Sequence, residues 1–131
     1  MKKNAHKTIL VIEDSPSLNR VLVERIETED FNTLSAFNGR EGLDIAYSKK
    51  PDLILLNITM PVLDGYGFFE QLRENSWGKD AKVIILTNLS IKNERLAKLV
   101  VQKNPIAFLT KSSTKLRDLM RYIHYALDEE S

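Results

Sequence analysis

The chain of 131 residues contains no cysteine, which excludes disulfide bonds and thiol chemistry and fits the reducing cytoplasm. Neither sign of charge is in excess, because 19 lysines and arginines and 18 acidic residues leave a net charge of +1. That balance does not favour binding to nucleic acid or to a membrane surface. No apolar run approaches the length of a transmembrane helix, and the N-terminus has no signal-peptide core.

The residues that are present have the composition of a globular domain, with 43% hydrophobic and 28% charged residues. A chain of this length is large enough to bury a core of its own. We find no internal repeat, low-complexity tract or linker. The sequence therefore predicts one domain over residues 1–131, with an ordered core over about residues 7–128.

Short apolar runs alternate along the chain with stretches in which apolar residues recur at helical spacing. The run 53–56 is too short for a helix and too uniformly apolar for a half-exposed strand, so it is predicted to be buried on both faces. Strands are predicted over residues 8–12, 33–37, 53–56, 81–86 and 105–109. This alternation predicts an α/β fold: a five-stranded parallel sheet in the flavodoxin-like order 2-1-3-4-5, with helices on both faces.

Capping residues indicate where the helices begin. Ser15-Pro16 predicts the start of the first helix, Asn38 with Glu41 the second, and Ser90 the fourth. The apolar positions of the five helices are Leu18, Val21, Leu22 and Ile26; Leu43, Ala46 and Tyr47; Phe68, Phe69 and Leu72; Ile91, Leu96, Leu99 and Val100; and Leu116, Leu119, Met120, Ile123 and Leu127.

Polar residues follow four of the five predicted strands: Glu13 and Asp14, then Asn57, Thr87 and Lys111. Each alone is an ordinary strand end or helix cap, but parallel strands bring their carboxyl ends to one edge, so the five together indicate a site. Adjacent carboxylates repel each other and resist burial unless a cation lies between them, and Mg²⁺ meets that need. Thr87 can donate a hydrogen bond, and the charge of Lys111 suits a phosphoryl oxygen.

Over nearly its full length the chain resembles the receiver domains of two-component response regulators. The resemblance rests on Glu13-Asp14, Met60-Pro61, Asp64-Gly65, Thr87 and Phe108-Leu109-Thr110-Lys111. In this family an acidic pair binds Mg²⁺, and an aspartate at the end of the third strand accepts a phosphoryl group from a histidine kinase.

Carried over to this chain, the resemblance assigns Glu13, Asp14 and the main-chain carbonyl of Thr59 to the metal. It assigns Thr87 and Lys111 to phosphoryl contact, and Thr87 and Phe108 to a switch that moves on activation. It implies a histidine kinase or phosphotransfer protein as one partner. A downstream protein would bind the face formed by the fourth helix, fifth strand and fifth helix. With the balanced charge noted above, we expect no membrane partner and no direct nucleic-acid contact by this domain, and homodimer formation stays open.

The position of the phosphoryl acceptor holds Asn57, which departs from the family pattern. An amide nitrogen is not a nucleophile, and an amide oxygen cannot form the acyl phosphate that a carboxylate forms. Asn57 can still offer an uncharged oxygen to a metal, so we expect a weakened Mg²⁺ site. We therefore expect a signalling module, not an enzyme, that is held unphosphorylated. Natural loss, a laboratory substitution and a coding difference all fit, although survival of the other site residues favours recent loss or deliberate change.

A second departure is Ser112, which stands where the family usually has proline after the lysine. A cis bond costs roughly 2.5–4 kcal/mol before a residue other than proline. We therefore expect the Lys111–Ser112 peptide bond to be trans.

An alternative from another class is a metal-dependent phosphohydrolase of flavodoxin-like fold, with Asp14 as its nucleophile. The sequence offers no general base and no Gly-rich phosphate loop for this reaction, and both His6 and His124 lie outside the strand ends. A flavin carrier is supported still less, because the acidic loop after the first strand would repel a phosphate.

Overall fold

The computed structural model describes residues 7–90 and 92–127. Its sheet is formed by β1 (Thr8–Ile12), β2 (Asn32–Ala36), β3 (Leu53–Leu56), β4 (Val83–Thr87) and β5 (Ala107–Thr110). Neighbouring strands are parallel throughout, and their order is β2-β1-β3-β4-β5. The predicted fold class and strand order are therefore confirmed.

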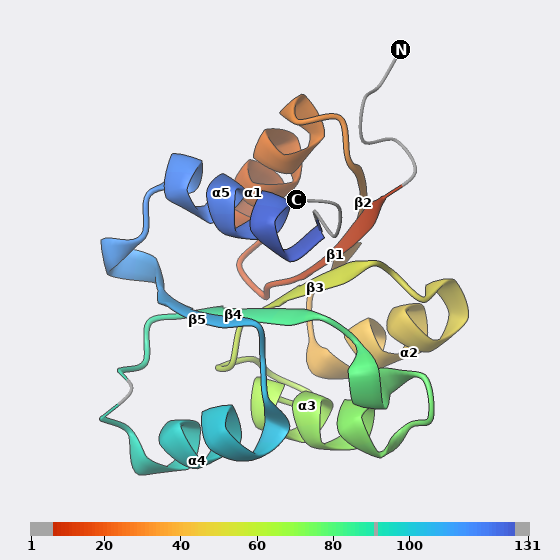
Figure 1. The fold of residues 1–131 in the computed structure, drawn as a ribbon, viewed down its shortest axis with the longest axis vertical. Helices are drawn as coiled ribbons and strands as arrows, with labels where there is room; N and C mark the ends of the chain where they lie inside the picture. The colour runs from red at the N-terminus through yellow and green to blue at the C-terminus, as the bar shows by residue number, and fades with distance from the viewer. Residues whose placement is uncertain (1–6, 91, 128–131) are drawn as a thin grey trace.

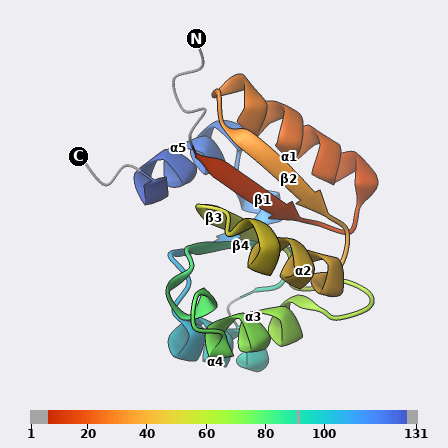
Figure 2. The same ribbon diagram turned by 90° about the vertical axis from the view of Figure 1, so that its right-hand side faces the viewer.

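Helices cover both faces of this sheet, as predicted. They are α1 (Pro16–Thr28), α2 (Gly39–Lys49), α3 (Gly65–Glu74), α4 (Glu94–Lys103) and α5 (Leu116–Leu127), with the short 3-10 helices η1 (Gly78–Asp80) and η2 (Lys111–Ser113). Figure 1 shows α1 and α5 on one face and α2, α3 and α4 on the other, and the turned view of Figure 2 shows the same layers. Within the described residues, no helix combines the length and the apolar character that a membrane span needs.

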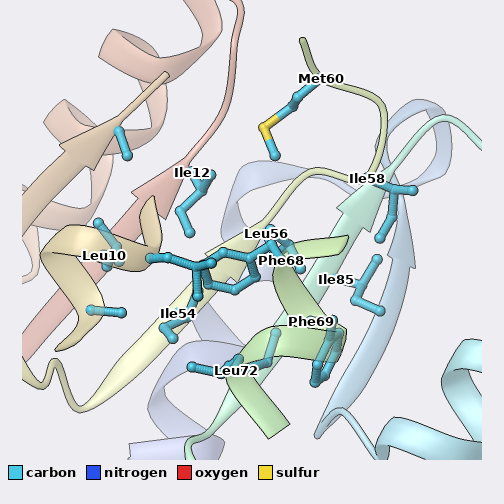
Figure 3. Close-up of a cluster of buried hydrophobic side chains, with 14 of the residues drawn as sticks. Leu10, Ile12, Ile54, Leu56, Ile58, Met60, Phe68, Phe69, Leu72 and Ile85 are labelled. Atoms are coloured by element: carbon cyan, nitrogen blue, oxygen red, sulfur yellow. The ribbon is translucent and has the colours of Figure 1, made fainter. Parts of the chain in front are cut away.

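Each face of the sheet has its own hydrophobic core, and β3 contributes to both. Ile54 and Leu56 face the cluster under α2, α3 and α4, whereas Leu53 and Leu55 face the cluster under α1 and α5. In Figure 3, Phe68 of α3 points toward Ile54 and Leu56 of β3. All four β3 side chains are buried, each contributing about 1.5–3 kcal/mol, which explains why the strand is apolar at every position.

Two of the three predicted helix caps are confirmed. Ser15 caps α1, where its hydroxyl accepts a hydrogen bond from the Leu18 N–H at 3.4 Å, and Pro16 is the first helical residue. Asn38 caps α2, where its Oδ1 accepts from the Glu41 N–H at 2.8 Å.

The predicted start of α4 is wrong. Its N-cap is Asn93, whose Oδ1 accepts from the Leu96 N–H at 3.0 Å. Ser90 instead accepts from the Lys92 N–H at 3.1 Å and so closes a local turn. Serine and asparagine are both good capping residues. A helix that begins after Asn93 already includes Leu96 and Leu99, which are buried. The predicted helical position Ile91 lies outside the described residues.

Smaller differences concern element ends and one helix face. The second, fourth and fifth strands are each displaced by one or two residues from the predicted bounds. On α1, Val21 is 46% exposed although it has helical spacing with the buried residues, and Asn19 is buried in its place. The apolar side chains of α1 that are buried are Leu22 and Ile26.

Candidate functional site

The carboxyl edge of the sheet gathers the polar residues singled out in the sequence. Glu13 and Asp14 follow β1 and Asn57 follows β3, and these two strands are adjacent, with Ile12 in register with Leu56. Thr87 ends β4 and pairs in register with Thr110, the residue before Lys111. Side-chain contacts join Asn57 to Asp14 and Lys111 to Glu13.

Asn57 is the centre of the first contact and is 6% exposed. Its side-chain nitrogen, Nδ2, donates to Asp14 Oδ1 at 3.0 Å and to the Thr59 carbonyl oxygen at 3.0 Å. Both partners are acceptors only, so the nitrogen and not the oxygen of the amide must face them. The Asn57 amide thereby links the loop after β1 to the loop after β3.

Glu13 is the centre of the second contact, and its side chain is 4% exposed. Lys111 Nζ lies 2.6 Å from Glu13 Oε1, and the Ser15 N–H donates to Glu13 Oε2 at 2.9 Å. Both oxygens of this buried carboxylate are therefore bonded, as a buried charge requires. The ammonium group of Lys111 neutralises Glu13 in this arrangement.

Thr87 and Phe108, the residues predicted to form a switch, lie on β4 and β5. Thr87 is buried, and its Oγ1 accepts from the Leu89 N–H at 3.3 Å, which ties it to the loop that follows β4. Phe108 pairs in register with Ile85 and packs, partly buried, against the core beneath α3 and α4. Their predicted role in switching stays a prediction.

Asn19, which the sequence analysis missed, positions the backbone behind the acidic pair. Its Nδ2 donates to the carbonyls of Glu13 at 3.1 Å and Ala36 at 3.2 Å, and its Oδ1 accepts from Ser35 Oγ at 2.8 Å. This buried side chain fixes the ends of β1 and β2 relative to α1. A signal was available, because Asn19 occupies the Leu22–Ile26 face of the helix, where an apolar residue would be expected.

The loop that follows Thr59 carries unusual backbone geometry beside the site. Val62 has φ 59° and Leu63 has φ 116°, values that residues other than glycine rarely adopt. The Leu63 carbonyl accepts from the Gly39 N–H at 2.9 Å, which holds this loop on the start of α2. On the other side of the site, the Lys111–Ser112 bond is trans as predicted, since no peptide bond among the described residues is cis.

The side chains as arranged do not form an open metal site. In the described part of the chain, no three His, Cys, Asp or Glu side chains gather as they would around a metal ion. Asp14 Oδ1 and the Thr59 carbonyl are suitable hard ligands, but both accept hydrogen bonds from Asn57. Glu13 is bonded to Lys111 and to the backbone. A divalent ion would have to replace hydrogen bonds that are already formed.

Comparison with known proteins shows which family the chain belongs to. The model of the response regulator receiver domain matches residues 9–124, which is most of the chain. The chain belongs to this family. Receiver domains are in general signalling modules of two-component systems, and response regulators interact with histidine kinases or phosphotransfer proteins.

Curated relatives are longer than this receiver chain. It is 33% identical over 123 residues to a "Probable transcriptional regulator ycf27" of Porphyridium aerugineum, a match that covers 94% of this chain and 50% of the relative. It is 35% identical over 91 residues to the "Response regulator MprA" of Mycolicibacterium vanbaalenii, covering 70% of this chain and 38% of the relative. The receiver chain thus spans half or less of these relatives.

Solved receiver structures share the fold. The signal receiver domain of a histidine kinase from Syntrophus aciditrophicus has a TM-score of 0.83 and 28% identity, covering 95% of this chain and 94% of that one. The receiver domain of the sensor histidine kinase PA1611 from Pseudomonas aeruginosa also has a TM-score of 0.83, with 24% identity and coverage of 94% and 98%. That structure is described as having a magnesium ion coordinated in its active-site cleft.

Proposed function

We propose that this receiver domain works as a signalling module that is not phosphorylated at the usual acceptor position. The observation that carries the proposal is Asn57, which follows β3 at the carboxyl edge of the sheet and directs its amide nitrogen at Asp14 and Thr59. An amide at this position cannot attack a phosphoryl donor to form an acyl phosphate. The other residues of the family pattern, Glu13, Asp14, Thr87 and Lys111, are present in the sequence, which supports a block that lies in the acceptor itself.

The other site residues take the roles that the family pattern suggests once a carboxylate stands at position 57. Glu13, Asp14 and the Thr59 carbonyl are the proposed metal ligands, and Thr87 and Lys111 are the proposed phosphoryl contacts. Mg²⁺ would supply positive charge that lets several oxygen anions lie close together. For Lys111 to reach a phosphoryl oxygen, its bond to Glu13 at 2.6 Å would have to break.

For partner binding we propose the face formed by α4, β5 and α5, where β5 lies between the two helices at the edge of the sheet (Figure 1). The two helices of this face carry exposed hydrophobic residues, among them Val101 of α4 at 81% and Tyr125 of α5 at 79% exposure. A groove of about 660 Å³ beside α5 is lined by Arg121, Tyr122 and Tyr125, residue types that dominate binding energy in interfaces. These features support a downstream protein partner on this face.

No observation favours the phosphohydrolase alternative. His124, which could act as a general base, lies far from the carboxyl edge: its Nε2 is 2.8 Å from Glu29 Oε1, and its ring packs against Phe31. Asp14, the nucleophile in that alternative, accepts a hydrogen bond from Asn57.

The proposal is tested by intact-mass measurement after incubation with acetyl phosphate and Mg²⁺. The unaltered chain should gain no mass, whereas Asn57→Asp should gain one phosphoryl group. Asn104→Asp makes the same chemical change at an exposed position that ends α4, and it should behave like the unaltered chain. Beryllofluoride binding to Asn57→Asp reports on the shape of the pocket without phosphoryl transfer.

Two results would contradict the proposal. If Asn57→Asp takes up no phosphoryl group and binds no beryllofluoride, the pocket has lost function beyond residue 57. If the unaltered chain is modified, fragment mapping to the site would show that a neighbour such as Asp14 replaces the usual acceptor.

A further inference from the structure

We infer that the side-chain amide of Asn57 takes the place of the divalent cation, so that the site of this chain stays assembled without metal. This inference deepens the proposed function and rests on it, because it concerns how an unphosphorylated receiver site is held together. It goes beyond a weakened metal site: the site is closed by its own hydrogen bonds, and its structure should not depend on Mg²⁺.

The first support is the direction of the Asn57 hydrogen bonds. One nitrogen bridges a carboxylate oxygen of Asp14 and the carbonyl oxygen of Thr59, each at 3.0 Å. A hard cation at this place would likewise be bound by oxygen atoms from the two loops. The two N–H groups of the amide carry partial positive charge and satisfy two acceptors that would otherwise lie close together with nothing between them.

The second support is the charge of the site. Glu13 and Asp14 contribute two negative charges and Lys111 one positive charge, so the three groups sum to −2 + 1 = −1. Glu13 is neutralised by Lys111 at 2.6 Å, and Asp14 receives the amide of Asn57. With an aspartate at position 57 the same sum would be −2, and three carboxylates would share one crevice. Only that variant has a strong electrostatic need for a divalent cation.

The third support is what metal binding would require of the unaltered chain. Asn57 is 6% exposed, and it would have to rotate its amide so that the oxygen faced the ion. Both of its hydrogen bonds would break, and the ion would gain an uncharged ligand instead of a carboxylate. Mg²⁺ gives up its bound water reluctantly, so it should compete poorly with bonds that are already formed.

Thermal unfolding with and without millimolar Mg²⁺ tests this inference, with ionic strength matched by a monovalent salt. The melting temperature of the unaltered chain should rise by less than about 1 °C on Mg²⁺ addition, whereas that of Asn57→Asp should rise by several degrees. Without Mg²⁺, Asn57→Ala should melt below the unaltered chain, because the link between the two loops is lost.

The outcomes separate this inference from the proposed function. A rise in the unaltered chain as large as in Asn57→Asp would overturn the inference even if phosphorylation behaves as proposed. An Asn57→Asp variant that responds to Mg²⁺ but takes up no phosphoryl group and binds no beryllofluoride would leave the inference standing while the proposed function fails. If Asn57→Ala is as stable as the unaltered chain without Mg²⁺, the amide holds nothing together and the inference is wrong. The titration of the unaltered chain remains decisive if either variant fails to fold.

Discussion

The backbone N–H of Gly39 donates to the carbonyl oxygen of Leu63 at 2.9 Å, which fixes the loop beside the site onto the first turn of α2. A Cβ atom at position 39 would lie 2.1 Å from that same oxygen. Since a backbone atom cannot move aside as a side chain can, the loop itself would have to shift. Position 39 therefore requires glycine if the loop is to keep this contact with α2.

Gly39→Ala should lower the free energy of unfolding by roughly 1–3 kcal/mol, as overpacking in a tight contact does. Urea unfolding monitored by circular dichroism measures the change. Gly67→Ala is the matched control, because its added Cβ would meet no backbone atom this closely, and its one contact below 3.0 Å is with the end of the Leu63 side chain, at 2.5 Å. That control should change stability by less than about 1 kcal/mol, since alanine also favours the helix. Equal losses in the two variants would show that the Gly39 contact is not special.

Val62→Gly should stabilise the chain by up to about 1 kcal/mol. A left-handed backbone costs non-glycine residues roughly 1–2 kcal/mol, and glycine avoids this cost, but its greater freedom in the unfolded chain offsets about 0.5–1 kcal/mol of the gain. Val62 has φ 59° and is 67% exposed, so little packing is lost with its side chain. Val101→Gly, at an 81% exposed position within α4, should instead destabilise by about 0.5 kcal/mol. Chemical denaturation of both variants measures the sign, and a loss of stability in Val62→Gly would contradict the strain that we infer.

Asn93→Ala should destabilise the chain by about 1 kcal/mol, because Asn93 caps α4 through its 3.0 Å bond from Leu96 N–H. Ser90→Ala should stay within about 0.5 kcal/mol, because Ser90 closes only an exposed turn. Hydrogen exchange of the first α4 amides locates the effect. A larger loss of stability for Ser90→Ala than for Asn93→Ala would show that α4 is capped by Ser90, as predicted from the sequence.

Stability should fall as the pH rises above about 10, because the pKa of two tyrosines is raised in the folded chain. Burial raises the pKa of Tyr66 above 10.0, which Arg95 opposes and Asp64 reinforces; burial likewise raises that of Tyr47, with Arg40 opposing and Glu74 reinforcing. The unfolded phenols lose their protons first, so this contribution is complete below pH 10 and is lost as the pH passes through the folded values.

Urea midpoints measured across this alkaline range check the prediction. A chain carrying both Tyr47→Phe and Tyr66→Phe keeps the rings but cannot titrate at these positions. Its midpoint should fall less steeply with pH than that of the unaltered chain. Identical slopes would show that these phenols contribute nothing to the pH dependence.

The layers of the fold could be predicted because the pattern of burial is repeated along the chain. Each residue of β3 is buried from one face or the other, so the run of apolar residues identified a central strand directly. The first residue of α4 could not be predicted from the pattern of apolar residues. Ser90 and Asn93 are three residues apart and both cap well, and only the packing of Leu96 against the sheet decides between them.

Within the site, the residue types could be predicted but not their pairing. That Glu13, Asp14, Asn57 and Lys111 meet follows from parallel strands ending at one edge. Which oxygen Lys111 contacts depends on distances between loops that are far apart in sequence. The role of Asn19 could not be predicted because it binds main-chain carbonyl groups, which every residue has and which no residue type therefore indicates.

Whether the Asn57 amide closes the site is tested most directly by measuring the hydrogen bonding of its two side-chain protons. In a nitrogen-15 correlation spectrum its two side-chain protons can be assigned by their absence from Asn57→Asp. We expect both protons to exchange slowly with water, since each is donated to an oxygen at 3.0 Å, and both cross-peaks to stay in place when millimolar Mg²⁺ is added. Rapidly exchanging protons whose cross-peaks move on addition of Mg²⁺ would contradict a site closed by its own amide.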